Sequence, residues 1–254
     1  MIRIAPFHAN FYKGVLDGSV TVDKSNPNRT VTYIKQSAKN IDIKELLHEF
    51  SDADKLSGST DLILDVSSVT ADNSSFLSGL NGTMQLTLNK GSMKGMDVIY
   101  QLSRAHAFIK RLSSHGLSDS KQTDFASLTA SGVINNGVIN TDNLTLISDY
   151  LKVNGKGSTN LVTKDIHYRL NALAQPKLAA VNDQIGKEIT VYQVPIKVSG
   201  KLTKPSVNLD FAELAKTFLT KEIQKPVTEH LQKNINNLKD SLKAKVQEKL
   251  KSIS

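Results

Sequence analysis

The chain has 254 residues and a formal net charge of +8 at pH 7, and this length can bury a core as one elongated domain or as two smaller ones. It contains no cysteine, which excludes disulfides, thiolate chemistry and Cys-based metal sites. No segment approaches the roughly 20 consecutive apolar residues of a membrane span, and residues 1–7 lack the apolar core of a signal peptide.

The first half of the chain is predicted to alternate strands with short helices. Two helices are expected: residues 43–50, with Asp42 as the N-cap, and residues 95–112, with apolar side chains near one side. Residues 73–80 read as a short helix or turn, and the polar segment 115–123 reads as a linker. Two-residue alternation predicts strands at 2–11, 15–22, 30–37, 57–66 and 81–88.

The segment 125–210 is a further series of predicted antiparallel strands, because short apolar–polar alternations are separated by turn residues. Asn136-Gly137 supplies the positive φ of a tight hairpin. Gly155-Lys156-Gly157 is also predicted to be a hairpin turn. It resembles a phosphate-binding glycine loop only superficially, because such loops lead into a helix and this one leads into a strand.

After Asp210 the period changes to that of a Lys-rich amphipathic helix. Residues 211–254 contain nine Lys against five Asp and Glu, a net charge of +4. Such a helix can lie on an anionic membrane surface, bind a partner protein or pack on its own sheet. The residues expected to carry the membrane or partner contact are Val227, Leu231, Ile235, Leu238, Lys239, Leu242, Lys243, Val246 and Leu250.

Nothing in the sequence predicts catalysis, a metal or a cofactor. The six His are scattered without the spacing of a zinc site. Asp61, Asp65 and Asp72 lie on and just beyond one apolar strand, with no His or Lys partner suggested by spacing. Nucleic acid is disfavoured as a partner because the tail has no Arg and the strands do not interleave aromatic and basic residues.

Two ordered sets of short motifs carry a family resemblance. The first runs from Lys39-Asn-Ile-Asp-Ile-Lys-Glu-Leu-Leu47 through Leu56-Ser-Gly58 and Leu80-Asn-Gly-Thr83 to Lys90-Gly-Ser-Met-Lys-Gly-Met-Asp97. The second set is Thr123-Asp-Phe-Ala-Ser-Leu-Thr129, Gly137-Val138, Gly155-Lys-Gly157, Val194-Pro-Ile-Lys-Val-Ser-Gly200 and Pro205-Ser-Val-Asn-Leu-Asp210. Over about residues 12–210, this order resembles the C-terminal region of bacterial AsmA-family proteins.

The resemblance implies a periplasmic protein of outer-membrane maintenance and phospholipid movement, with no catalytic residues. Members of that family have an N-terminal inner-membrane helix, and this sequence lacks one. The expected location is therefore the periplasm, tethered to the inner membrane by a helix absent from this chain.

The predicted fold class is α+β and predominantly antiparallel β: a curved, elongated sheet that forms an apolar groove, with short helices and a C-terminal amphipathic helical tail. Three parts are expected: a first β-groove module at 1–121, a second at 122–210 that continues the sheet, and the basic helical tail at 211–254.

The predicted function is non-enzymatic: the groove holds or conducts phospholipid acyl chains between the inner and outer membranes. The alternative is a scaffold whose sheet forms a closed core and whose tail docks a protein partner. A one-residue slip would reverse the predicted inward face of any strand. The expected lipid-binding side chains are Met84, Leu86, Leu88, Val133, Leu144, Leu146, Val194, Ile196 and Val198.

Overall fold

The computed structural model of the chain describes residues 1–50, 56–71, 75–109, 122–175, 177 and 193–220. Contacts within the chain divide it into two units, Met1–Phe211 and Ala212–Ser254. Every strand of the described residues belongs to the first unit, and in the second unit residues 212–220 are helical.

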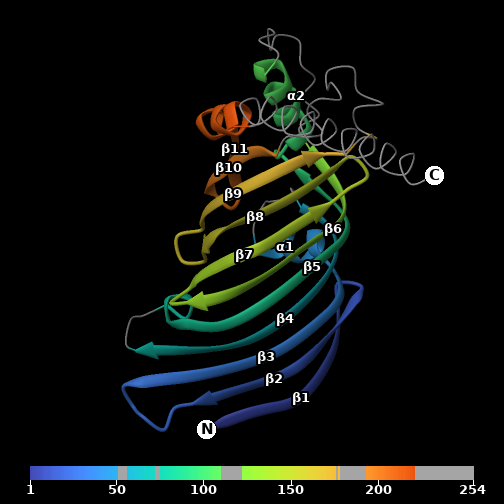
Figure 1. Ribbon diagram of the computed structural model, residues 1–254. Helices are drawn as coiled ribbons and strands as arrows, with labels where there is room; N and C mark the ends of the chain where they lie inside the picture. The colour runs from blue at the N-terminus through green and yellow to red at the C-terminus, as the bar shows by residue number, and fades with distance from the viewer. Residues whose placement is uncertain (51–55, 72–74, 110–121, 176, 178–192, 221–254) are drawn as a thin grey trace, which may run out of the picture. The chain divides into compact units, whose positions relative to one another are not determined.

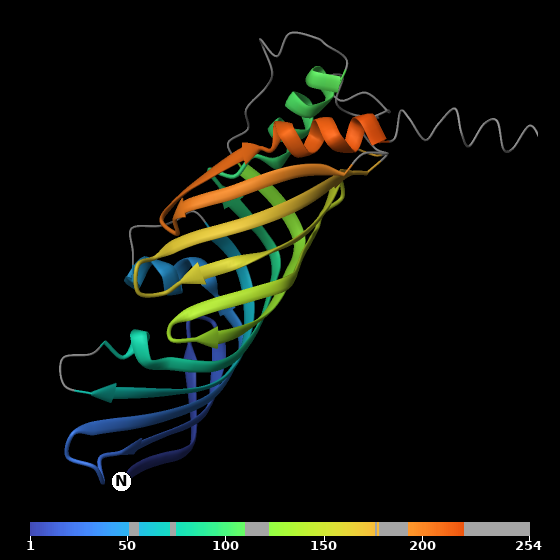
Figure 2. The ribbon, with the colours of Figure 1, turned by 60° about the vertical axis from the view of Figure 1, so that its left-hand side comes forward.

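The first unit is built on one eleven-stranded antiparallel sheet in which the strands follow their order along the chain (Figures 1 and 2). The sheet is open, with β1 and β11 as its edges, and it is strongly curved. The predicted antiparallel, curved sheet is thus confirmed. Its strands are β1 Ile2–Phe11, β2 Gly14–Asp23, β3 Arg29–Asp42, β4 Leu56–Ala71, β5 Leu80–Lys94, β6 Gln122–Asn135, β7 Val138–Ile147, β8 Leu151–Asn160, β9 Asp165–Ala174, β10 Val194–Lys201 and β11 Lys204–Leu209.

The strand registers align apolar side chains into rows that cross the sheet. Directly paired residues on one face share an environment, so a continuous apolar row requires every pair of strands to keep its register. One row crosses all eleven strands, and we call its face the inner face: Ile4, Val20, Ile34, Val66, Gly82, Ile134, Ile139, Thr159, Ile166, Gly200 and Pro205. A second row on the same face runs from β3 to β10: Ile41, Thr60, Leu88, Leu128, Leu146, Val153, Ala172 and Val194.

The burial of the inner face varies along the sheet. On this face Val20, Ile34 and Leu62 are only half-buried, and Ile4 at the β1 edge is 57% exposed, whereas Ile41 and Val66 are buried. In β10, Ile196 is 1% exposed. The inner face is therefore more accessible at its β1 end than at its β10 end.

A β-bulge in β7 preserves the inner face. The register of β7 shifts by one residue against both neighbouring strands, between Asn140 and Thr145 against β6 and between Thr141 and Leu144 against β8. Asn143 repairs the interrupted ladder: its Oδ1 accepts from the Ser131 backbone N–H at 2.9 Å, and its Nδ2 donates to Ser131 Oγ. The extra residue lets Ile139 and Leu146 point to the same face although they are seven positions apart.

Two helices interrupt the strand order, as predicted. α1, Ile43–Phe50, follows β3, and the Asp42 carboxylate accepts the Lys44 backbone N–H at 3.1 Å as the expected N-cap. α2, Val98–Ile109, contacts β6, β9, β10 and β11. Its buried residues Val98, Leu102 and Ala105 are spaced as one helical face. A short 3₁₀ helix, η1 Leu77–Gly79, precedes β5.

The prediction of a turn at Gly155-Lys156-Gly157 is wrong, because these residues lie inside β8. A Cβ at Gly155 would meet Cδ2 of Leu170, and a Cβ at Gly157 would meet the backbone of His167 and Tyr168 in β9. These glycines therefore make room for the neighbouring strand rather than reverse the chain. The chain turns after Asn160 instead, where the Asn160 Oδ1 accepts the backbone N–H groups of Val162 and Thr163.

Burial at the β10 end predicts that a charge substitution there lowers the free energy of unfolding far more than one at an exposed side chain. Ile196→Asp places an unpaired carboxylate in a closed environment and should reduce the free energy of unfolding by about 3 kcal/mol or more. Val133→Asp, at a side chain that is 52% exposed, should change it by less than about 1 kcal/mol. Urea unfolding followed by circular dichroism measures both, and similar losses would contradict the assigned faces.

The N-cap of α1 predicts a pH-dependent contribution to stability. Lys13 Nζ lies 2.8 Å from Asp42 Oδ2 and 2.9 Å from Glu45 Oε1, and its hydrogen bond lowers the pKa of Asp42 below the ordinary value. The ionised Asp42 therefore stabilises the fold above its unfolded-state pKa of about 3.9, and this contribution is lost as the pH falls through the lower folded-state value.

Asp42→Asn should accordingly lower the thermal midpoint at pH 7, and the difference from the unsubstituted chain should shrink at pH 3. Thermal unfolding at the two pH values is the measurement. A constant difference would mean that the carboxylate charge at Asp42 contributes nothing.

Candidate functional site

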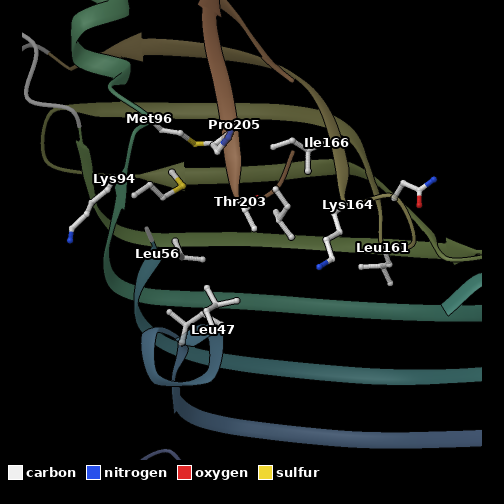
Figure 3. A pocket seen from close by; sticks show the side chains of 13 residues that line it. Leu47, Leu56, Lys94, Met96, Leu161, Lys164, Ile166, Thr203 and Pro205 are labelled. Atoms are coloured by element: carbon white, nitrogen blue, oxygen red, sulfur yellow. The ribbon is translucent and has the colours of Figure 1, made fainter. Parts of the chain in front are cut away.

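An apolar cavity of about 430 Å³ lies on the inner face of the sheet (Figure 3). Most of its lining is aliphatic or Met, and the inner-face residue Ile166 belongs to its wall. The lining residues are Ile43, Leu47, Leu56, Met93, Lys94, Met96, Asn160, Leu161, Lys164, Ile166, Leu202, Thr203 and Pro205.

Sheet curvature creates this cavity by bringing opposite strand ends together. Leu56 and Met93 are paired at one end of β4 and β5. Leu161 and Leu202 belong to the turns β8–β9 and β10–β11, at the other end of the strands. In Figure 3, β11 crosses over the strands behind it, so these turns reach the side of the sheet on which α1 lies.

Helix α1 supplies one wall of the cavity. Ile43 is buried and Leu47, one turn further along the same helical face, is half-buried. In Figure 3 the Leu47 side chain points from α1 toward the cavity. The N-cap at Asp42 and the Lys13 bridge hold the start of this wall against the β1–β2 turn, where the Asp42 backbone N–H donates to the Tyr12 carbonyl at 2.9 Å.

The cavity lining has a positive rather than a negative charge. It contains two lysines, Lys94 and Lys164, and no Asp or Glu. Lys164 points from the β8–β9 turn into the space between the apolar side chains, whereas Lys94 extends away from it. The cavity can therefore accept an apolar chain, with a cation at its side.

None of the nine side chains predicted to bind lipid belongs to this lining. Leu88, Leu146, Val194, Ile196 and Val198 are buried on the inner face. Met84, Leu86 and Leu144 are half-buried, and Met84 packs against the buried cluster of Val66, Leu80 and Ile134.

Val133 differs from the other eight because it lies on the opposite face. It pairs with Thr83, whereas Met84 pairs with Gly132. Of the adjacent residues Val133 and Ile134, Ile134 is the buried one. Met84 and Val133 both line a separate hollow of about 680 Å³ beside the β7 bulge. Its lining includes Gln85, Asp142 and Lys156, so it is far more polar than the cavity.

The carboxylates considered for catalysis have structural partners. Asp61 Oδ1 accepts the Asn40 backbone N–H at 2.8 Å, beside the register shift between β3 and β4. Asp65 forms an ion pair with Lys35 at 2.9 Å, and Asp72 lies outside the described residues. Within the described ranges, no group of three or more His, Asp or Glu is arranged to hold a metal ion.

The predicted membrane or partner contact lies outside the described residues, because residues 221–254 are not among them. Of the helices that the structure does describe, none has the length and apolar character needed to span a membrane.

Sequence could not identify the cavity from any single motif. Its walls come from α1, the end of β5 and two hairpin turns, and these segments are distributed from Ile43 to Pro205 along the chain. The one available signal is composition: Leu161, Val162 and Leu202 are apolar residues in turns, where polar residues are usual.

Comparison with known proteins gives one match. Searches of curated proteins and of solved structures find no significant similarity to this chain. The family model described as "AsmA family" matches residues 1–144, which span β1 to the bulge of β7 and include more than half of the chain. This chain therefore belongs to the AsmA family.

Proposed function

We propose that this chain is a non-enzymatic protein of the bacterial envelope whose inner face is an apolar groove for phospholipid acyl chains. The supporting observation is the inner-face row that crosses all eleven strands, in which Ile4 is exposed and Val20 and Ile34 are only half-buried. Because this row runs perpendicular to the strands, it offers an extended binding surface rather than a single binding point. Membership of the AsmA family supports a role in the envelope and in lipid transport.

Acyl-chain binding on this face requires no polar recognition. Each methylene group removed from water contributes about 0.8 kcal/mol, so several methylenes on the half-exposed residues would offset the ordering of a flexible chain. The 430 Å³ cavity falls in the usual range of roughly 300–1,000 Å³ for small-molecule sites. It has room for a chain rather than for a whole phospholipid.

The proposed location is the periplasm, with tethering to the inner membrane by a transmembrane helix, and the proposed activity is passive movement of lipid between the two membranes. Both follow from the family and from the groove, and they require no cofactor or catalytic residue. The competing scaffold function requires a sheet with a closed core, whereas the observed sheet is open with β1 and β11 as its edges. A scaffold would also carry no lipid.

Leu62→Asp is the sharpest test of the groove, because Leu62 is half-buried on the inner face. Its matched control is Ile63→Asp: Ile63 is the next residue of β4, points to the opposite face and is 51% exposed. Leu62→Asp should remove most co-purified phospholipid, since acyl chains would have to dehydrate a carboxylate, while Ile63→Asp should keep it.

Native mass spectrometry of chains purified from bacteria measures the bound lipid. Far-UV circular dichroism should show the same strand content in both variants. A lipid-free spectrum of the unsubstituted chain would favour the scaffold, and retention of lipid by Leu62→Asp would place the lipid elsewhere.

We further propose that the C-terminal segment binds an anionic membrane surface or an envelope protein. The basis is the apolar spacing from Val227 to Leu250 and the net charge of +4 over residues 211–254. Deleting residues after Lys225 should then abolish co-sedimentation with anionic vesicles, and added salt should weaken binding of the intact chain, since screening reduces attraction to lysines. Aggregation of the shortened chain would instead mean that this segment covers the sheet.

A further inference from the structure

We propose that the cavity takes one acyl chain of a phospholipid whose head group carries a net negative charge, and that the Lys164 ammonium binds this head group. The proposal rests on the proposed function and adds a preference among lipids to it. Its basis is the combination of an acid-free apolar lining and a lysine directed into it.

The β8–β9 turn holds the backbone of Lys164 in a fixed position. Lys164 has a φ of 61°, in the left-handed region that few non-glycine residues adopt. The Asn160 side chain caps the turn through two backbone N–H groups at 2.9 and 3.0 Å. The Lys164 carbonyl accepts the Leu202 backbone N–H at 2.8 Å, which ties this turn to the β10–β11 turn.

The charges around Lys164 leave its ammonium available for a ligand. The adjacent carboxylate, Asp165, is paired with Lys201 at 2.7 Å. Within the part of the chain that the structure describes, Lys164 forms no ion pair. An ammonium beside apolar side chains gains more from an anion than one in open water, because the effective dielectric constant is lower there.

Lys164 also lies at the right place relative to the apolar lining. In Figure 3 its side chain and that of Leu161 descend together from the turn toward the space opposite Leu47 and Leu56. An acyl chain between these leucines would bring its head group toward the ammonium of Lys164, which is an exposed residue. A phosphodiester there would accept charge-assisted hydrogen bonds, whereas a head group with its own ammonium would repel Lys164.

Lys164→Gln tests this inference, because it removes the charge and keeps a side chain of similar length. The matched control is Lys90→Gln. Lys90 is an exposed lysine with a φ of 50° and does not line the cavity, so the substitution makes the same chemical change in the same backbone conformation.

The probes are lysophosphatidylglycerol and lysophosphatidylcholine with identical acyl chains, used below their micelle-forming concentrations and titrated calorimetrically. The unsubstituted chain should bind the anionic lipid roughly three- to tenfold more tightly than the zwitterionic one, the range expected from a charge-assisted hydrogen bond at a partly exposed site. Lys164→Gln should abolish this preference by weakening the anionic lipid alone, and Lys90→Gln should retain it.

The outcomes separate this inference from the proposed function. If the unsubstituted chain binds both lipids equally, or if Lys164→Gln keeps the preference, the role of Lys164 is overturned while acyl-chain binding stands. If Lys90→Gln loses the preference to the same extent, general surface charge is the cause and the inference is again overturned. If neither lipid binds the unsubstituted chain, the proposed function itself fails.

Discussion

The continuous alignment of the strand registers across the sheet is the constraint on which the rest of the structure depends. Side chains alternate between the two faces, so a slip of one residue in any strand would move its apolar set to the opposite face. Eleven strands keep Ile4, Ile134 and Ile166 in one row. Where a strand carries an extra residue, as β7 does, Asn143 fills the gap in the ladder, so the bulge restores alignment rather than breaking it.

Curvature then turns one aligned face into two different environments. Toward β10 the inner face is buried, and α2 contacts β9, β10 and β11. Toward β1 no helix of the described residues makes a comparable set of contacts with the first two strands, and their apolar side chains remain half-exposed. The cavity lies between these regions, where α1 faces the hairpin turns. A single sheet therefore offers both a stable core and an accessible apolar surface.

Sequence predicts what is local in this fold. Asn136-Gly137 forms the hairpin turn, with Gly137 at a φ of 77°, and Asp42 caps α1, because each depends on a few neighbouring residues. The sequence does not predict which role a glycine has: Gly137 turns the chain, while Gly155 admits Leu170 of the next strand. That distinction requires the identity of the opposing residue, which only the register provides.

The same limit explains which inward-facing residues could be predicted from the sequence. Where Leu144 and Leu146 alternate with polar residues, the inner face follows from the pattern. At Val133-Ile134 two apolar residues are adjacent, so alternation fits either face, and the structure buries Ile134. The cavity is even harder to predict from the sequence, because it depends on how strongly the whole sheet curves. No spacing of residues along the chain encodes the degree of this curvature.

The strict chain-order arrangement of the strands has a consequence for how such a sheet can change in length. Each strand pairs only with its immediate predecessor and successor, so within the described ranges no strand distant in the sequence closes the sheet. Insertion or loss of one hairpin would add or remove two strands and leave every other pairing intact, much as a repeat is added to a solenoid. Because two strands restore the direction of the chain, the alternation of faces would also continue unchanged. The length of the inner face can therefore evolve in steps of one hairpin, independently of the helices that flank it.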